Sequence, residues 1–168
     1  MTAKELMDQL ANDPDYQRRM KEKEERLKPI WDARKKDQEE LVREINEIGY
    51  SIESVYDLVN NAPHPVLERK FIGPYPKAYP ILLKHLNLPH EKIIREGIIR
   101  ALTEKDAGRE VEEALLDNFQ KEKDPDTKWV LANALSRIMP YHRRRKYPEI
   151  RKTLKPNKTE PDATGQRR

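Results

Sequence analysis

The sequence predicts an all-α fold: a short α-solenoid (an α-α superhelix of helical repeats) preceded by an N-terminal helical hairpin or long helix pair. Three observations support this prediction. The chain has only five glycines in 168 residues, and its thirteen prolines separate clusters of Leu, Ile and Val. Helices punctuated by prolines fit this composition better than a β-sandwich or barrel, which needs many glycine-rich turns. The apolar residues also recur at helical spacing, and the later helices repeat with a period of about 33 residues.

The sequence predicts that residues 1–61 form amphipathic helices, which cap the rest of the chain as a hairpin. Their longest helix-forming segment runs from Asp15 to about Ile48 and is dense in Glu, Lys and Arg. Pro29 should kink or split this segment. Two amphipathic helices are therefore favoured over a coiled coil, and one continuous helix stays as an alternative. The apolar residues of the segment follow a spacing near 3.5 residues: Tyr16, Met20, Leu27, Trp31, Leu41, Ile45 and Ile48.

Shorter helices are predicted on both sides of that segment. Thr2 and Glu5 have the spacing of a capping box for a helix through Leu10. After Gly49, Ser51 is the expected N-cap of a short helix that ends near Asn60. The apolar residues of this second helix have i, i+3, i+4, i+7 spacing: Ile52, Val55, Tyr56 and Val59.

The rest of the chain divides into a connector, a helical region and a tail. Residues 62–77 are rich in proline and predict a connecting loop with one helical turn at most. Residues 155–168 have no apolar side chain that could anchor them, so we expect them to form a disordered basic tail. The helices expected between connector and tail span residues 78 or 80 to 86, 92–105, 109–121, 125–138 and 147–154.

An internal repeat relates these helices within residues 78–154. A shift of 33 residues superposes Leu82, Leu83 and Leu86 on Leu115, Leu116 and Phe119. The same shift superposes Ala101 and Leu102 on Ala134 and Leu135. Two helices in each unit of 30–45 residues are typical of an α-solenoid. Because a single unit cannot bury its apolar face alone, neighbouring units must stack.

Two segments of this region resemble the HEAT-repeat family. IREGIIRAL (94–102) has the aliphatic, basic and small residues and the final Ala-Leu of the second helix of a HEAT unit, with Arg95 at the basic position and Gly97 at a small one. TKWVLANAL (127–135) is similar, although its first two residues depart from the pattern. The wider block resembles small bacterial HEAT-like proteins of undefined role. The resemblance implies a fold, but it specifies no function, since such arrays are scaffolds for many tasks.

The resemblance also implies where a partner would bind. Second helices of HEAT units line the concave surface of the solenoid, which places five side chains there: Glu96, Arg100, Trp129, Asn133 and Arg137. Trp129 lies opposite a complete apolar stripe on its helix, so it is either a protein-binding anchor or packs beneath the basic C-terminal segment. We expect a non-enzymatic protein-interaction module. Stacking of exposed solenoid ends into a homodimer is a further alternative.

Gly97 and Arg95 have expected structural roles. Gly97 costs about 1 kcal/mol of helix propensity relative to alanine, but it lies on the buried stripe of its helix. A missing side chain there should let a neighbouring helix approach closely. Arg95 flanks the same stripe and should reach an inter-repeat turn or a carboxylate of a neighbouring helix.

The C-terminal segment HRRRKYPEIRK (142–152) supports a second function. The last 32 residues contain 11 basic and 3 acidic side chains, a net charge of +8, and clustered cations bind phosphates with release of counterions. The alternative is a solvated polar cap for the last repeat. Nucleic acid is therefore the runner-up partner, through Arg143, Arg144, Arg145, Lys146, Arg151 and Lys152.

Other classes of site find no support in the sequence. The chain has no cysteine, which excludes disulfides, thiolate catalysis and Cys-based zinc sites. Its four histidines lack metal-ligand spacing, and His85 is expected as a partly buried core residue. Neither a glycine-rich phosphate loop nor a nucleophile elbow occurs, so no catalytic, metal or cofactor residue is predicted. No apolar run approaches the ~20 residues of a membrane span, and the N-terminus lacks a signal-peptide core, which favours the cytoplasm.

Overall fold

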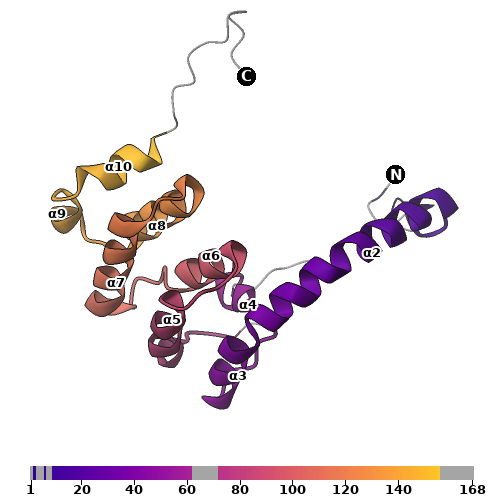
Figure 1. Ribbon diagram of the computed structural model, residues 1–168, viewed down its shortest axis with the longest axis horizontal. Helices are drawn as coiled ribbons and strands as arrows, with labels where there is room; N and C mark the ends of the chain where they lie inside the picture. The colour runs from indigo at the N-terminus through magenta and orange to yellow at the C-terminus, as the bar shows by residue number, and fades with distance from the viewer. Residues whose placement is uncertain (1, 3–5, 7–8, 62–71, 156–168) are drawn as a thin grey trace, which may run out of the picture.

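The computed structural model describes residues 2, 6, 9–61 and 72–155 (Figure 1). In this part of the chain every regular element is a helix and no strand occurs, so the all-α prediction is confirmed. Three expectations lie wholly or partly outside the described residues. They are the capping box that needs Glu5, most of the connector 62–77, and the tail 155–168 beyond its first residue.

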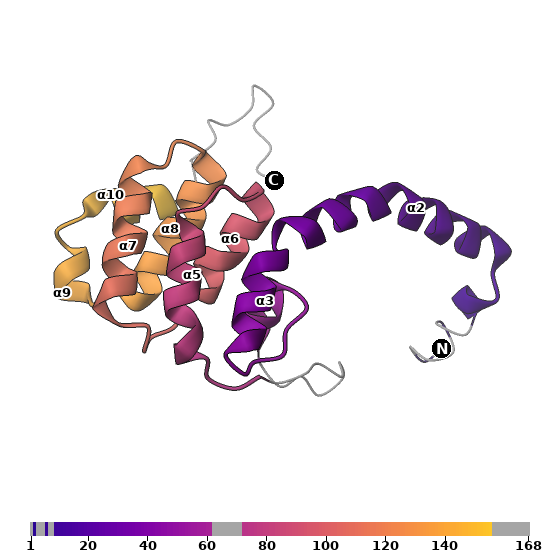
Figure 2. The same cartoon turned by 60° about the horizontal axis from the view of Figure 1, so that its bottom comes forward.

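The segment predicted between residues 15 and 48 is two helices, α2 (Pro14–Asp37) and α3 (Glu39–Glu47). The side chain of Asp13 caps α2 by accepting from the backbone N–H groups of Asp15 and Tyr16 at 2.9 and 3.2 Å. Pro29 was expected to kink or split this segment; the split is wrong, because α2 continues through Pro29, whereas a kink is compatible with the curvature of α2. Figure 2 shows α2 as an arch. A proline removes only one intrahelical hydrogen bond. Because α2 is exposed, water can bind the backbone carbonyl that loses its partner, and the helix can continue.

The division between α2 and α3 comes at Gln38, for a tertiary reason. Gln38 is 6% exposed, and its Oε1 accepts from the backbone N–H of Val55 at 3.0 Å and from the Ser54 hydroxyl at 3.2 Å. This contact ties the end of α2 to the start of α4 (Val55–Val59). The predicted cap at Ser51 is corrected to Ser54, whose side chain accepts from Tyr56 N–H while Asp57 accepts from Ser54 N–H at 3.0 Å.

The remaining helices lie close to their predicted positions. The connector ends in a short 3₁₀ helix, η1 (Pro76–Ala78). The helix predicted over 92–105 ends at Ala101, before a turn that leads to Gly108 at φ +83°. One short helix was not predicted, α9 (Tyr141–Arg144). The others are α5 (Tyr79–Leu86), α6 (Lys92–Ala101), α7 (Gly108–Lys121), α8 (Pro125–Ile138) and α10 (Pro148–Leu154).

The helices pack in two rows. In one row α3 contacts α5 and α5 contacts α7; in the other α4 contacts α6 and α6 contacts α8. The pairs α5–α6 and α7–α8 join the rows, and α10 packs against α8 (Figure 1). Fully buried side chains from successive helices form one core, including Leu41, Leu82, Ile98, Leu115, Leu131 and Ile150.

Two residues of α6 explain how close the neighbouring helices lie. A Cβ at Gly97 would stand 2.7 Å from Val55 Cγ1 and 3.1 Å from Tyr56 Cε2, so the expected close approach is confirmed and the neighbour is α4. Arg95 forms an ion pair with Glu122 at the end of α7 and donates to Asn118 Oδ1 at 3.0 Å. Its predicted reach to a neighbouring carboxylate is also confirmed.

Candidate interaction surfaces

The five residues predicted on a concave face lie on α6 and α8, which run side by side. Lys92 at the start of α6 pairs with the N-cap Asp124 and with Asp126 at the start of α8, at 2.8 and 2.7 Å. These contacts and the N–H group of Thr127 hold the pKa of Asp124 at about 2, below its ordinary value. The two helix starts are therefore fixed together.

Glu96 and Arg100 come together on α6. The Glu96 side chain is only 12% exposed, accepts from the Thr127 hydroxyl at 3.4 Å and lies 3.8 Å from Arg100. It stabilises the α6–α8 contact, which leaves Arg100, with a side chain that is 39% exposed, as the more accessible charge of the pair.

Trp129 is the large exposed side chain of α8. It is 45% exposed, so the basic segment 142–152 does not cover it fully, although α10 packs against α8. Asn133, one turn further along α8, is partly exposed. Arg137 is exposed and lines a hollow with Glu104 and Asp106 of the α6–α7 loop, about 12 Å from Trp129 along the helix axis. Trp129 does not line this hollow.

Two cations of the basic segment are engaged within the fold. Arg143 lies 3.0 Å from the buried carboxylate of Glu112, and Arg144 donates to the carbonyl of Ser136 at the end of α8. Ile150 is fully buried and fixes α10 on α8. The other four predicted nucleic-acid residues are exposed: Arg145, Lys146, Arg151 and Lys152.

A second surface, on α2, was not predicted as a binding site. None of the 24 residues of α2 is buried, and Figures 1 and 2 show the helix extending away from the other helices. Met20 and Trp31 are 43% and 48% exposed. They belong to the apolar series that the sequence had indicated, which we name the α2 stripe: Tyr16, Met20, Leu27 and Trp31. The same series continues into α3, where Leu41 and Ile45 are fully buried.

The α2 stripe ends in a groove at the base of the helix. Trp31 and Arg34 form one side of this groove, which has a volume of about 570 Å³, and Tyr56 and Ile93 form the other. The Tyr56 hydroxyl donates to the carbonyl of Ile93 at 2.9 Å, and partial burial raises the pKa of Tyr56. The groove therefore has apolar and aromatic walls, and its charged lining residues are Arg34, Lys35 and Glu53.

Buried titratable groups fix the base of α2 to the helical rows. Asp37, the last residue of α2, accepts from His90 Nδ1 at 3.0 Å and from the backbone N–H of Glu91 at 3.2 Å. His90 Nε2 lies 3.0 Å from His85 Nδ1, and His85 Nε2 lies 3.4 Å from Glu44 on α3. Burial lowers the pKa of His85 and outweighs the opposing charge of Glu44. The prediction of a core histidine is confirmed, but its link through His90 to Asp37 was missed.

Neither a metal-binding cluster nor a membrane-spanning helix occurs among the described residues. No group of three or more His, Cys, Asp or Glu side chains is arranged to hold a metal ion in that part of the chain. Among the helices of the described ranges, none is both long enough and apolar enough to cross a membrane.

Comparisons of the chain with protein-family models, with curated proteins and with solved structures found no match.

Proposed function

We propose that this protein is a non-enzymatic protein-interaction module, built as a short HEAT-like solenoid, that binds a protein partner through the exposed faces of α6 and α8. The residues of this surface are Glu96, Arg100, Trp129, Asn133 and Arg137, with Glu96 in a supporting role beneath Arg100.

The order of helix contacts supports the solenoid. Successive first helices (α3, α5, α7) contact one another, and so do successive second helices (α4, α6, α8). Stacking of this kind is how repeat proteins bury faces that one unit cannot cover. A covered end is also expected of a short array, and α10 packs against α8 at that end.

The observation that carries the binding proposal is the exposure of Trp129. A tryptophan that is 45% exposed keeps a large apolar area in water, and interface hot spots are enriched in Trp, Tyr and Arg. Arg100 on the adjacent helix and Arg137 on the same face supply the charged surroundings typical of the rim of an interface.

Nucleic-acid binding through residues 142–152 is the alternative proposal. It relies on the four exposed cations of that segment, because Arg143 and Arg144 already have partners within the fold. Four phosphate contacts are few for tight binding at physiological salt, so we favour the protein partner.

Co-purification from cells that express the chain tests the proposal. We expect Trp129→Ala to lose a partner that the wild type and Tyr141→Ala retain, since Tyr141 is 70% exposed but lies outside the α6–α8 face. A photo-reactive side chain at Asn133 should crosslink the same partner. Circular dichroism should show equal helicity for all variants.

Two results would contradict the proposal. One is an unchanged set of partners in Trp129→Ala. The other is binding of a 20-base-pair DNA duplex at roughly 50–100 mM salt. If this binding is lost when Arg145, Lys146, Arg151 and Lys152 are all replaced by Glu, the result supports the alternative.

A further inference from the structure

A second interaction surface lies on α2, apart from the α6–α8 face. The α2 stripe spans about 22 Å of helix from Tyr16 to Trp31, and nothing in the described part of the chain buries it. From Leu27 onward, alternating steps of four and three residues lead through Trp31 to Leu41 and Ile45 on α3, with the polar Arg34 and Gln38 at the two steps between them. Such a seven-residue period is the pattern that pairs helices side by side. Along α3 the body of the protein covers the series; along α2 it stays open.

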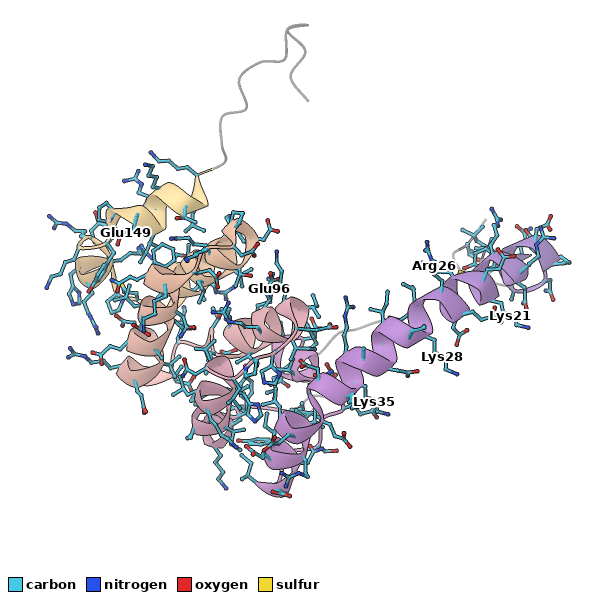
Figure 3. The ribbon with its side chains drawn as sticks, viewed as in Figure 1. Lys21, Arg26, Lys28, Lys35, Glu96 and Glu149 are labelled. Carbon is cyan, nitrogen blue, oxygen red and sulfur yellow. The ribbon has the colours of Figure 1, made fainter. Side chains whose placement is uncertain are left out.

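Lysines line one edge of the α2 stripe. Lys21, Lys28 and Lys35 recur every seven residues, so they lie on one line beside the stripe; we name them the lysine edge. Figure 3 shows them along one side of α2, with Arg26 on the other side. All three are exposed, and none has an ion pair among the described residues. Asp32 and Glu53 line neighbouring hollows with Lys35 without pairing with it.

The acidic side chains of α2 mostly lie elsewhere on the helix. At 100° per residue, Asp15, Glu22 and Glu25 project away from the α2 stripe. Lys23 adds a cation to the opposite edge of the stripe. The open face of α2 is thus an apolar ridge between basic edges, with one carboxylate, Glu24, within it and a second, Asp32, just beyond the lysine edge.

We propose that α2 binds an acidic amphipathic helix of another protein, laid along the α2 stripe with its carboxylates against the lysine edge. Its apolar residues cover Met20, Leu27 and Trp31, and its end reaches the groove formed by Trp31, Tyr56 and Ile93. From Lys21 to Lys35 the contact spans about 21 Å, or four helical turns. Acidic residues spaced by seven on the partner match the spacing of the lysines.

Charge complementarity favours this occupant over the others. In an antiparallel pair of two copies the lysine edge would meet itself, and in a parallel pair it would meet the edge that carries Lys23, so both arrangements bring like charges together. Glu24 in the middle of the stripe opposes burial in a lipid bilayer, whereas a protein helix can place a lysine or an amide opposite it. Nucleic acid would leave the apolar side chains uncovered.

The test uses the full chain and two labelled synthetic peptides of 18 residues. Both peptides carry leucines at the a and d positions of a heptad; one carries glutamates at e and g, and the other lysines. We expect fluorescence anisotropy to show binding of the glutamate peptide only. Binding should weaken with added salt and in Trp31→Ala.

Charge-reversed variants locate the contact. K21E/K28E/K35E should weaken binding of the glutamate peptide by about tenfold or more, because it places like charges across the interface. R18E/K36E/K123E changes the net charge equally, at two positions on the face of α2 opposite the stripe and one in the α7–α8 loop, and should weaken binding much less. Glutamate is a good helix former, so helicity should be equal in both variants, and Trp129→Ala should bind the peptide normally.

Several outcomes would overturn the assignment. The first two are a failure of the glutamate peptide to bind and equal weakening of its binding by both triple variants. A third is a dimer in sedimentation experiments that Trp31→Ala dissociates. A fourth is binding of phosphatidylserine vesicles or of a DNA duplex, dependent on the lysine edge, by a protein that does not bind the peptide. If the peptide fails while Trp129 remains necessary for capture of a partner, the α2 assignment falls and the proposed function stands.

Discussion

At the scale of single residues, contacts across helices decide which side chains the fold tolerates. Gly97 is the clearest case, because its helix faces the fully buried side chain of Val55. Helix propensity alone would favour alanine at this position by about 1 kcal/mol. The space at the α4–α6 contact opposes that gain, since a Cβ would stand 2.7 Å from Val55 Cγ1.

We therefore expect Gly97→Ala to lower the free energy of unfolding. Overpacking of a core typically costs 1–3 kcal/mol, so a net loss of about 1 kcal/mol should remain after the gain in helix propensity is subtracted. For a chain of this size, that loss corresponds to a fall in Tm of roughly 2–4 °C. Thermal unfolding followed by circular dichroism measures it. In a double-mutant cycle with Val55→Ala, the pair should lose less than the sum of the single losses; additive losses would contradict the close contact.

At the scale of elements, the position of α2 depends on its last turn. No residue of α2 is buried, so ordinary core packing does not fix its direction. Asp37 instead receives hydrogen bonds from His90 and from the backbone of Glu91, and Arg34 Nε lies 3.5 Å from the Glu91 carboxylate. These polar contacts hold the base of α2 against the α5–α6 loop.

Asp37→Ala should therefore increase the range of directions that α2 adopts. Because the chain has no cysteine, a spin-label pair can be introduced at Glu25 on α2 and Gln120 on α7 without background. Electron-spin distance measurements should give a broader distribution for Asp37→Ala than for the parent. Asp32→Ala, which alters an exposed carboxylate on the same helix, is the control and should match the parent. An unchanged distribution in Asp37→Ala would show that other contacts hold α2.

At the scale of the whole molecule, one buried histidine links stability to pH. His85 is 1% exposed and contacts His90 and Glu44, with Lys84 beside it. Burial lowers the pKa of His85 below its ordinary value of 6.5, so the ring is neutral in the folded state at pH 7. The unfolded chain binds this proton more readily, and stability must fall as pH decreases from about 6.5 toward the lowered pKa.

We expect the Tm of the wild type to fall between pH 7.5 and 5.5. His85→Gln should start from a lower Tm, because it loses buried contacts, but its Tm should change less over the same interval. His142→Gln alters an exposed ring and should follow the slope of the wild type. Equal slopes for His85→Gln and the wild type would exclude His85 as the source of the pH dependence.

Much of the fold was predictable because helix formation depends on local sequence. The apolar spacing located the helices of residues 78–154 to within a few residues, and it placed Gly97 on a buried stripe. The errors have tertiary causes: α2 ends at Asp37, next to the Gln38 side chain that bonds to Ser54 and Val55, and not at Pro29. Ser54 is the cap of α4 because Asp57, three residues later, completes its capping box.

The sequence by itself determined the helices, their apolar faces and the seven-residue spacing of the lysines. Only the tertiary structure decided which faces are covered. Leu27 and Leu41 belong to one apolar series, yet Leu41 is fully buried while α2 has no buried residue. Burial depends on neighbours that are distant in the chain, as α5 is from α3 and as His90 is from Asp37. Local periodicity does not encode these neighbours, and for that reason the α2 surface emerged only in the folded protein.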